Sequence, residues 1–144
     1  MKWIGAFLLA VAWAGYAGAQ IVQCSDISAD FHWEASRTPD LLFCRAVSAE
    51  GEELFALTIS SDSPFRPQRS DRAETGVLGG GELQWYRGNT AQGEFIREAL
   101  IDVYRGGFDQ GKAHIFLRAP DAASMSLRQK MVETLKLPRV LDTD

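Results

Sequence analysis

Two apolar runs on either side of a short turn constrain the fold of this chain more than any other feature. Residues 41–48 are rich in β-forming side chains, and residues 54–60 alternate large apolar residues with Ala, Thr and Ser. Gly51 lies in the middle of the acidic turn between them. A period of two matches a strand with one buried face, and a short glycine turn joins such strands antiparallel. The two runs therefore predict a β-hairpin within an antiparallel sheet.

Three later segments also have strand character. Residues 82–88 place Trp85 and Tyr86 on opposite faces, so that Trp85 points into the core and Tyr86 points away from it. Residues 112–119 alternate in the same way and have one apolar face. Residues 94–104 fit either a strand or an amphipathic helix, and we favour a strand because the run is rich in β-formers and another strand follows at once. The expected sheet has about five strands.

A helix ends the predicted domain. Asp121 is a suitable N-cap, and Pro138 predicts that the helix stops near Lys136. Apolar residues recur every four positions and predict the face that packs against the sheet. The residues of this face are Ala123, Leu127, Met131 and Leu135. The predicted fold class is α+β, an antiparallel β-meander of about five strands with a C-terminal helix packed on one face.

The first residues have the pattern of a cleaved secretory signal peptide. Lys2 precedes a short apolar run, and an A-x-A motif ends at Ala19. The run is short for a membrane span, no stop-transfer segment follows, and the residues before Cys24 do not fit a lipoprotein signal. We therefore expect cleavage of residues 1–19. Residues 20–144 would form one domain in the periplasm or outside the cell, with no stable membrane anchor.

Two cysteines, Cys24 and Cys44, remain after the expected cleavage. An even number in an exported chain predicts a disulfide, and closing a loop of this length contributes about 3 kcal/mol. Free thiols and a redox pair are the alternatives, but there is no C-x-x-C motif. The disulfide would pin residues 20–39 to the first strand; this segment is otherwise irregular, with Phe31 and Trp33 as its expected anchors.

Nucleotides and nucleic acids are disfavoured as ligands. The glycine-rich residues 76–81 lead to Glu82 and a strand, whereas phosphate loops lead to a lysine or a helix. Residues 1–19 contain one basic residue, Lys2, and no acid, so the expected mature chain has 14 basic and 19 acidic residues. Its negative net charge lacks the strongly basic face of a nucleic-acid-binding protein.

The chain shows no convincing catalytic or metal-binding pattern. Asp30, His32 and Glu34 alternate and would share one side of a strand, which is a weak metal-site signal. His114 lies opposite the apolar face of its predicted strand, where a surface or half-buried histidine is expected. There is no G-x-S-x-G motif. We therefore expect no catalytic residue, no bound metal and no cofactor.

A long segment without clear periodicity is the best candidate for a binding surface. Residues 61–81 contain two prolines and three arginines, and loops of this length are often functional. Aromatic residues and arginine dominate the energetics of protein interfaces. The residues predicted to contact a partner are Phe65, Arg66, Arg69, Arg72, Tyr86 and Arg87.

These features favour an exported, non-enzymatic protein-binding module. Its sharpest form is an inhibitor or immunity protein against a cell-wall-degrading enzyme or a secreted effector, so the expected partner is another protein of the envelope or the medium. An envelope accessory protein that binds a small ligand or a larger complex is one alternative, and a small periplasmic hydrolase is another. Periplasmic lysozyme inhibitors share the size, leader and disulfide, but the S-G-x-x-Y motif of one inhibitor group is absent.

Overall fold

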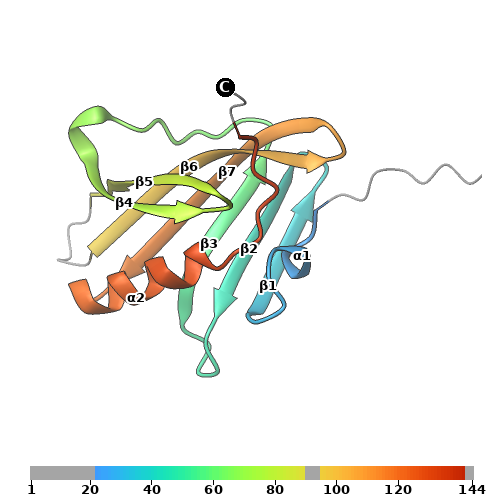
Figure 1. Cartoon of the computed structure of the whole chain (residues 1–144). Helices are drawn as coiled ribbons and strands as arrows, with labels where there is room; N and C mark the ends of the chain where they lie inside the picture. Colours follow the sequence, from blue (N-terminus) through green and yellow to red (C-terminus); the bar gives the residue numbers. More distant parts are fainter. Residues whose placement is uncertain (1–21, 90–94, 142–144) are drawn as a thin grey trace, which may run out of the picture.

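The structure is a computed structural model that describes residues 22–89 and 95–141 of the chain (Figure 1). Within these residues the strands form one antiparallel sheet of seven strands in the order β1-β2-β3-β7-β6-β5-β4. The elements are α1 (Cys24–Ile27), β1 (His32–Thr38), β2 (Leu41–Val47), β3 (Glu53–Ser60), the 3-10 turn η1 (Arg69–Asp71), β4 (Arg72–Leu78), β5 (Gly81–Arg87), β6 (Phe95–Gly106), β7 (Asp109–Ala119) and α2 (Ala122–Glu133). The α+β class is confirmed, but the sheet has more strands than the expected five. It is also not the predicted meander throughout, because β3 pairs with β7 and not with the next strand along the chain, β4. The predicted signal peptide, residues 1–19, lies outside the described residues.

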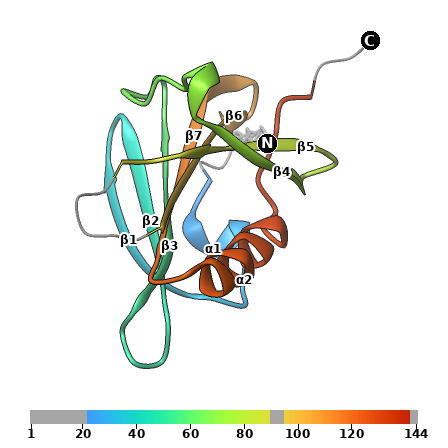
Figure 2. The ribbon, with the colours of Figure 1, turned by 90° about the vertical axis from the view of Figure 1, so that its left-hand side faces the viewer.

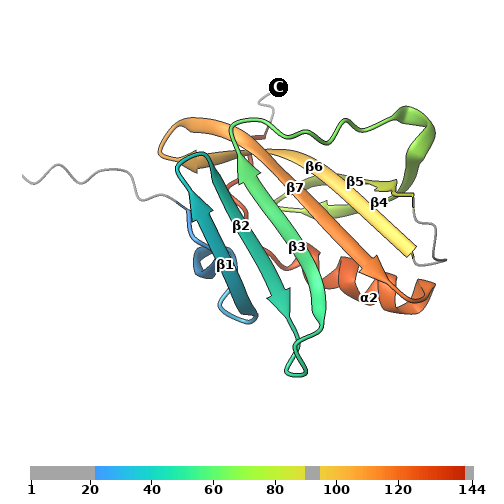
Figure 3. The ribbon, with the colours of Figure 1, turned by 180° about the vertical axis from the view of Figure 1, so that it is seen from behind.

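Both helices lie on one face of the sheet, which we call the inner face (Figures 1 and 2). Seen from behind, β1, β2, β3 and β7 carry no helix, and this side is the outer face (Figure 3). The predicted position of the terminal helix on one face of the sheet is therefore confirmed. None of the helices in the described part of the chain is long and apolar enough to cross a membrane.

The predicted hairpin and the predicted strand pair both form. β2 and β3 pair antiparallel, and Gly51 in their turn has a φ of +80°, which favours glycine. The ambiguous run is the long strand β6, which pairs with β7. On β6, Ala99, Ile101 and Val103 are buried, as expected for a strand with one inward face.

The two strands that the sequence did not predict are the two edges of the sheet. Residues 20–39 and 61–81 were expected to be irregular, but they contain β1 and β4. Six of the seven residues of β1 are exposed, and only Trp33 is partly buried. An edge strand with little buried surface needs no alternating apolar residues, so its sequence resembles a loop.

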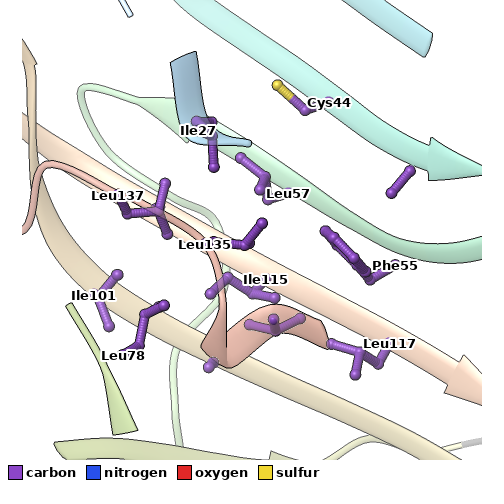
Figure 4. Close-up of a cluster of buried hydrophobic side chains, with 14 of the residues drawn as sticks. Ile27, Cys44, Phe55, Leu57, Leu78, Ile101, Ile115, Leu117, Leu135 and Leu137 are labelled. Atoms are coloured by element: carbon purple, nitrogen blue, oxygen red, sulfur yellow. The ribbon is translucent and has the colours of Figure 1, made fainter. Parts of the chain in front are cut away.

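The core fills the inner face between the sheet and α2 (Figure 4). Inward residues of β2, β3, β6 and β7 meet α2 and the segment that follows it, where Leu135 and Leu137 are buried. Trp85 of β5 is 1% exposed, so its predicted inward orientation is confirmed. Burial of these apolar side chains is the main favourable contribution to folding.

The helix α2 starts as predicted but turns a different face to the core. Asp121 is the N-cap, and its Oδ1 accepts a hydrogen bond of 2.7 Å from the Ser124 N–H. Of the predicted apolar face, Leu135 is buried and Met131 packs against the core, but Ala123 and Leu127 are exposed. Met125 and Val132 are buried in their place, so the first half of the predicted face is wrong. Residues four apart drift by about 40° per step around a helix, and the true contact face follows the 3.6-residue turn. The helix also ends at Glu133, before the predicted stop.

The predicted disulfide joins Cys24 of α1 to Cys44 of β2, with 5.7 Å between the two Cα atoms. Its strand is the second of the sheet rather than the first, because β1 precedes it. Phe31, Trp33 and Phe55 pack edge-to-face beside it, with ring centroids 5.1 to 5.8 Å apart. Phe31 and Trp33 are thus confirmed as the anchors of the N-terminal segment.

Candidate functional site

The β3–β4 loop, residues 61–71, is fastened to the outer face of the sheet by Phe65. Its ring stacks on the imidazole of His114 in β7, with centroids 4.7 Å apart and planes at 10°. The same ring meets Tyr86 of β5 edge-to-face at 6.2 Å. His114 and Tyr86 alternate with buried residues along their strands, so both point to the outer face. Phe65 and Tyr86, both predicted to contact a partner, are therefore neighbours.

Beneath Phe65, His114 forms a pair with a carboxylate. Its Nε2 lies 3.0 Å from Oε1 of Glu98 in β6, and the two side chains are only 21% and 19% exposed. No serine, threonine or cysteine among the described residues hydrogen-bonds to this imidazole. The arrangement holds the ring flat under Phe65, and it does not assemble a nucleophile with its base.

Hydrogen bonds within the β3–β4 loop give it a defined shape. Ser63 is buried, and its Oγ accepts a hydrogen bond of 3.2 Å from the Phe65 N–H. Oδ1 of Asp62 accepts a hydrogen bond of 2.8 Å from the Ser63 N–H. This bond and the nearby Arg66 charge hold the pKa of Asp62 below its usual value. The loop is therefore ordered by its own residues as well as by Phe65.

The three arginines around this loop differ in their contacts. Arg66 forms an ion pair of 3.2 Å with Asp62 and also donates to the carbonyl of Ser63. Arg69 and Arg72 are exposed, and their side chains form no hydrogen bond or ion pair within the described residues. Arg72 is opposite Tyr86 in the β4–β5 pairing, so it shares the outer face. We call Arg66, Arg69 and Arg72 the arginine patch.

Arg87 is separated from the other predicted contact residues. It follows Tyr86 directly in β5, so its side chain points to the opposite face of the sheet. There it is the register partner of Arg97 in β6. The structure therefore brings Phe65 and Arg72 beside Tyr86 on the outer face, with Arg66 and Arg69 in the segment that leads to Arg72, and it leaves Arg87 on the opposite face.

Sequence reasoning missed the roles of His114 and Glu98. The outward position of His114 was predicted and is confirmed, but its carboxylate partner and its aromatic cover were not foreseen. Both side chains occupy outward positions of strands that became neighbours only through the pairing of β6 with β7. Period-two analysis could have placed each residue on the outer face, but strand register was needed to bring them together.

The weak metal-site pattern in the N-terminal segment is not assembled. No group of three His, Cys, Asp or Glu side chains in the described ranges is placed to hold a metal ion. Asp30 precedes β1, and Glu34 forms an ion pair of 2.5 Å with Arg45. Residues that alternate in sequence share a face only when they belong to one strand.

A cavity of about 270 Å³ lies where the N-terminal half of α2 meets β4 and β6. Its lining includes Glu74, Arg97 and Gln129, which bind one another: Arg97 forms an ion pair of 2.8 Å with Glu74, and Gln129 donates to the same carboxylate. Ligand pockets are usually about 300–1,000 Å³ and use a few well-placed polar groups to orient the ligand. This cavity is small, and its polar groups are already paired.

The chain matches no known protein family, no curated protein and no solved structure.

Proposed function

We propose that this chain is an exported protein-binding module. In its sharpest form it is an inhibitor or immunity protein that recognises a cell-wall-degrading enzyme or a secreted effector. The binding surface would be the outer face around the β3–β4 loop. The observation that supports this proposal is the stacking of Phe65 on His114. It fixes the loop while leaving Arg69 and Arg72 exposed and without partners among the described residues.

A loop that is already ordered suits tight recognition. Binding orders side chains and loops, and this ordering opposes association. Phe65, Ser63 and Asp62 fix the backbone of this loop in the free protein. A partner that docks on the arginine patch would therefore lose less conformational entropy than one that docks on a mobile loop.

The charge of the patch indicates the chemistry of the partner. Three acids lie among the three arginines of residues 61–74, and Asp62 already pairs with Arg66. The guanidinium groups of Arg69 and Arg72 have no partner within the described residues and could accept one from another protein. Guanidinium groups bind carboxylates through paired hydrogen bonds. Carboxylates also carry out the chemistry of most glycoside hydrolases. The favoured partner is therefore an enzyme whose cleft exposes acidic residues.

Capture of the partner is the first experiment. Oxidised residues 20–144 are immobilised, and envelope extracts and culture medium of the producing and competing cells are passed over them. A bound protein is identified by mass, and its hydrolysis of cell-wall material is measured with and without the module. The proposal expects one stoichiometric partner whose activity falls when the module is added.

Variants then test the surface. Replacing Arg66, Arg69 and Arg72 together by alanine should weaken binding by more than tenfold, because each arginine contributes a charged contact. The control replaces Lys130 and Lys136, two exposed cations at the α2 side, by alanine and should bind as the wild type does. Unchanged affinity in the triple variant would refute the role of the arginine patch.

The two alternatives make different predictions for the same sample. A small-ligand protein would show no protein partner but would gain thermal stability with a ligand. A hydrolase would degrade a cell-wall substrate without any partner. Neither alternative requires the arginine patch, so the triple variant separates them from the proposal.

A further inference from the structure

The strand β1 is an edge with an open backbone. Each of its residues from His32 to Thr38 pairs with β2 in one continuous register, without a bulge. On its other side, no backbone group of β1 bonds to another element of the described chain. Such an edge presents free N–H and C=O groups in a regular row.

The usual protections of an edge strand are missing from β1. It contains neither proline nor lysine, and its two charged side chains are directed at its own molecule. Glu34 pairs with Arg45, and Arg37 donates to the carbonyl of Val22. Natural proteins avoid unwanted pairing by bulges, prolines or outward charges at such edges. The described β1 has no bulge and no proline, and its exposed charged side chains, Glu34 and Arg37, are both bonded within the chain.

We propose that β1 pairs antiparallel with β1 of a second copy of this chain, across a two-fold axis at Ala35. In this register Trp33 of one copy is opposite Arg37 of the other, and Glu34 is opposite Ser36. The sheet then continues from one copy into the next. The arginine patch is attached to the other end of the sheet, so a dimer would carry two such patches, one at each end.

The self-complementary sequence of β1 favours this register. Trp33 and Arg37 lie on the inner face, and the guanidinium group of Arg37 can lie against an indole ring of the second copy while one of its N–H groups still donates to Val22 of its own chain. The small side chain of Ala35 meets itself at the axis without steric conflict. A shift of the axis to Glu34 would place two carboxylates opposite each other, and a shift to Ser36 would remove the partner of Trp33.

The surface beside the strand has room for this contact. A mainly apolar cavity of about 280 Å³ lies on the inner face and is lined in part by Trp33, Ala35, Leu42 and the Arg37 of the same chain. The aliphatic stem of an arginine covers apolar surface of this kind while its charged end stays in water. Arg37 of the second copy, placed opposite Trp33, lies beside this cavity.

Sedimentation of residues 20–144, which contain every described residue, tests the pairing. We expect a dimer that forms as the concentration rises. Ala35 is exposed, so Ala35→Glu should fold normally while it places two carboxylates at the axis and weakens the dimer at least tenfold. Val77→Glu, the same change at an exposed position of β4, should dimerise as the wild type does.

A charge-reversed mixture makes the test specific for this axis. Ala35→Glu and Ala35→Lys should each remain monomeric, and an equimolar mixture should form the heterodimer. If the wild type stays monomeric at the highest soluble concentration, or if Val77→Glu weakens the dimer and Ala35→Glu does not, the proposal is overturned.

A crosslink tests the register. Opposite residues of an antiparallel pair have Cα atoms about 4.5–5.5 Å apart, a distance that a disulfide spans. Ala35→Cys should therefore form a dimer crosslink on mild oxidation, whereas the diagonal positions of Ser36→Cys are about 7–8 Å apart and should react more slowly. Faster crosslinking at Ser36 than at Ala35 would overturn the register.

Discussion

The two edges of the sheet are built in opposite ways. β1 pairs with its neighbour in an unbroken register, whereas β4 has a register shift between Arg72 and Thr75. On the inner face α2 reaches β4, where Gln129 donates to Glu74. On the open edge of β1, the side away from β2, no other element of the described ranges bonds to the backbone.

Different contacts anchor each edge strand to the rest of the molecule. β1 is held by the disulfide of the adjoining α1 and by the aromatic contacts of Trp33 with Phe31 and Phe55. Within the described residues the ribbon of β4 and β5 joins β6 through the pairs Tyr86 with Glu98 and Arg87 with Arg97 and through a backbone hydrogen bond of 3.3 Å from Gly88 to Ile96. It depends instead on core burial, on α2 and on the segment after α2 (Figures 1 and 2).

This contrast shows that an edge strand can be held rigidly in place and still keep its outward backbone groups free to pair. A covalent bond and three aromatic rings hold β1 in place without using its outward backbone groups, so it stays both rigid and open. In β4, by contrast, the carbonyls of Ala73, Glu74 and Leu78 accept hydrogen bonds from the side chains of Gln84 and Arg139. Within the described residues β1 is therefore the edge whose outward backbone is both preorganised and free of such bonds, as strand pairing between molecules requires.

Removing the core anchor of the β4–β5 ribbon should have the largest effect. Trp85→Ala deletes a fully buried indole and should lower the free energy of unfolding by about 3–5 kcal/mol. Thermal and denaturant unfolding measure the loss, and amide hydrogen exchange locates it. Exchange should rise in β4 and β5 and change little in β1 and β2.

The neighbouring residue provides the control. Tyr86→Ala removes an aromatic side chain from the outer face of the same strand, where it is only half-buried, so the loss should be smaller. An equal loss from both variants would contradict the claim that inward burial fixes this ribbon.

Removing the disulfide that anchors the β1 edge should cause the second-largest loss of stability. Cys24→Ala combined with Cys44→Ala should lower the free energy of unfolding by about 2–4 kcal/mol, because the disulfide restricts the unfolded chain. Exchange should now rise in α1 and β1 while β4 and β5 stay protected. Exchange that rises equally in all strands would show that the two edges are not held independently. Reduction of the wild type serves as the matched comparison.

The sequence predicted the parts of the fold that repeat a local pattern. The β2–β3 hairpin, the β6–β7 pair, the disulfide and the N-cap at Asp121 each have a local signature, and all are confirmed. The edge strands have no such signature because most of their side chains face water. The helix face was misjudged because a four-residue repeat was read as if it matched the helical turn.

The candidate site was predictable only residue by residue. Phe65, Tyr86 and the arginine patch were named from their residue types, and the structure places Phe65 and Arg72 next to Tyr86. Their common support, the stack on His114 and its bond to Glu98, depends on the order of β5, β6 and β7. Strand order is a long-range property, so the sequence alone did not specify it.

A smaller effect is expected from the clamp at the tip of the β4–β5 ribbon. Arg139 donates hydrogen bonds of 2.8 Å to the Leu78 carbonyl and 2.5 Å to the Glu82 carbonyl. Arg139→Ala should lower the free energy of unfolding by about 1.5 kcal/mol, near the lower limit for charged hydrogen bonds, because the site is partly exposed. Exchange at residues 78–82 should rise first. Arg139→Lys should restore part of the loss. An unchanged free energy of unfolding in both variants would show that these two hydrogen bonds do not stabilise the ribbon.

The smallest effect should come from the carboxylate that joins β4 to α2. Burial raises the pKa of Glu74, but hydrogen bonds from Arg97 and Gln129 outweigh burial and lower it below its ordinary value of 4.5. A carboxylate with a lowered pKa stabilises the fold above its unfolded pKa, and this contribution disappears as the pH falls through the folded value. Because the side chain is 45% exposed, Glu74→Gln should lower the free energy of unfolding by at most about 1 kcal/mol at pH 7.

The pH dependence distinguishes this role from a simple loss of surface charge. The stability difference between the wild type and Glu74→Gln should be constant above about pH 5.5 and should shrink as the pH falls below 4.5. Glu82→Gln removes an exposed carboxylate whose side chain has no partner in the described chain, and it should show no such trend. If the stability of Glu74→Gln relative to the wild type depends on pH in the same way as that of Glu82→Gln, the charge of Glu74 does not stabilise the contact between β4 and α2. That contact would then rest on apolar packing alone.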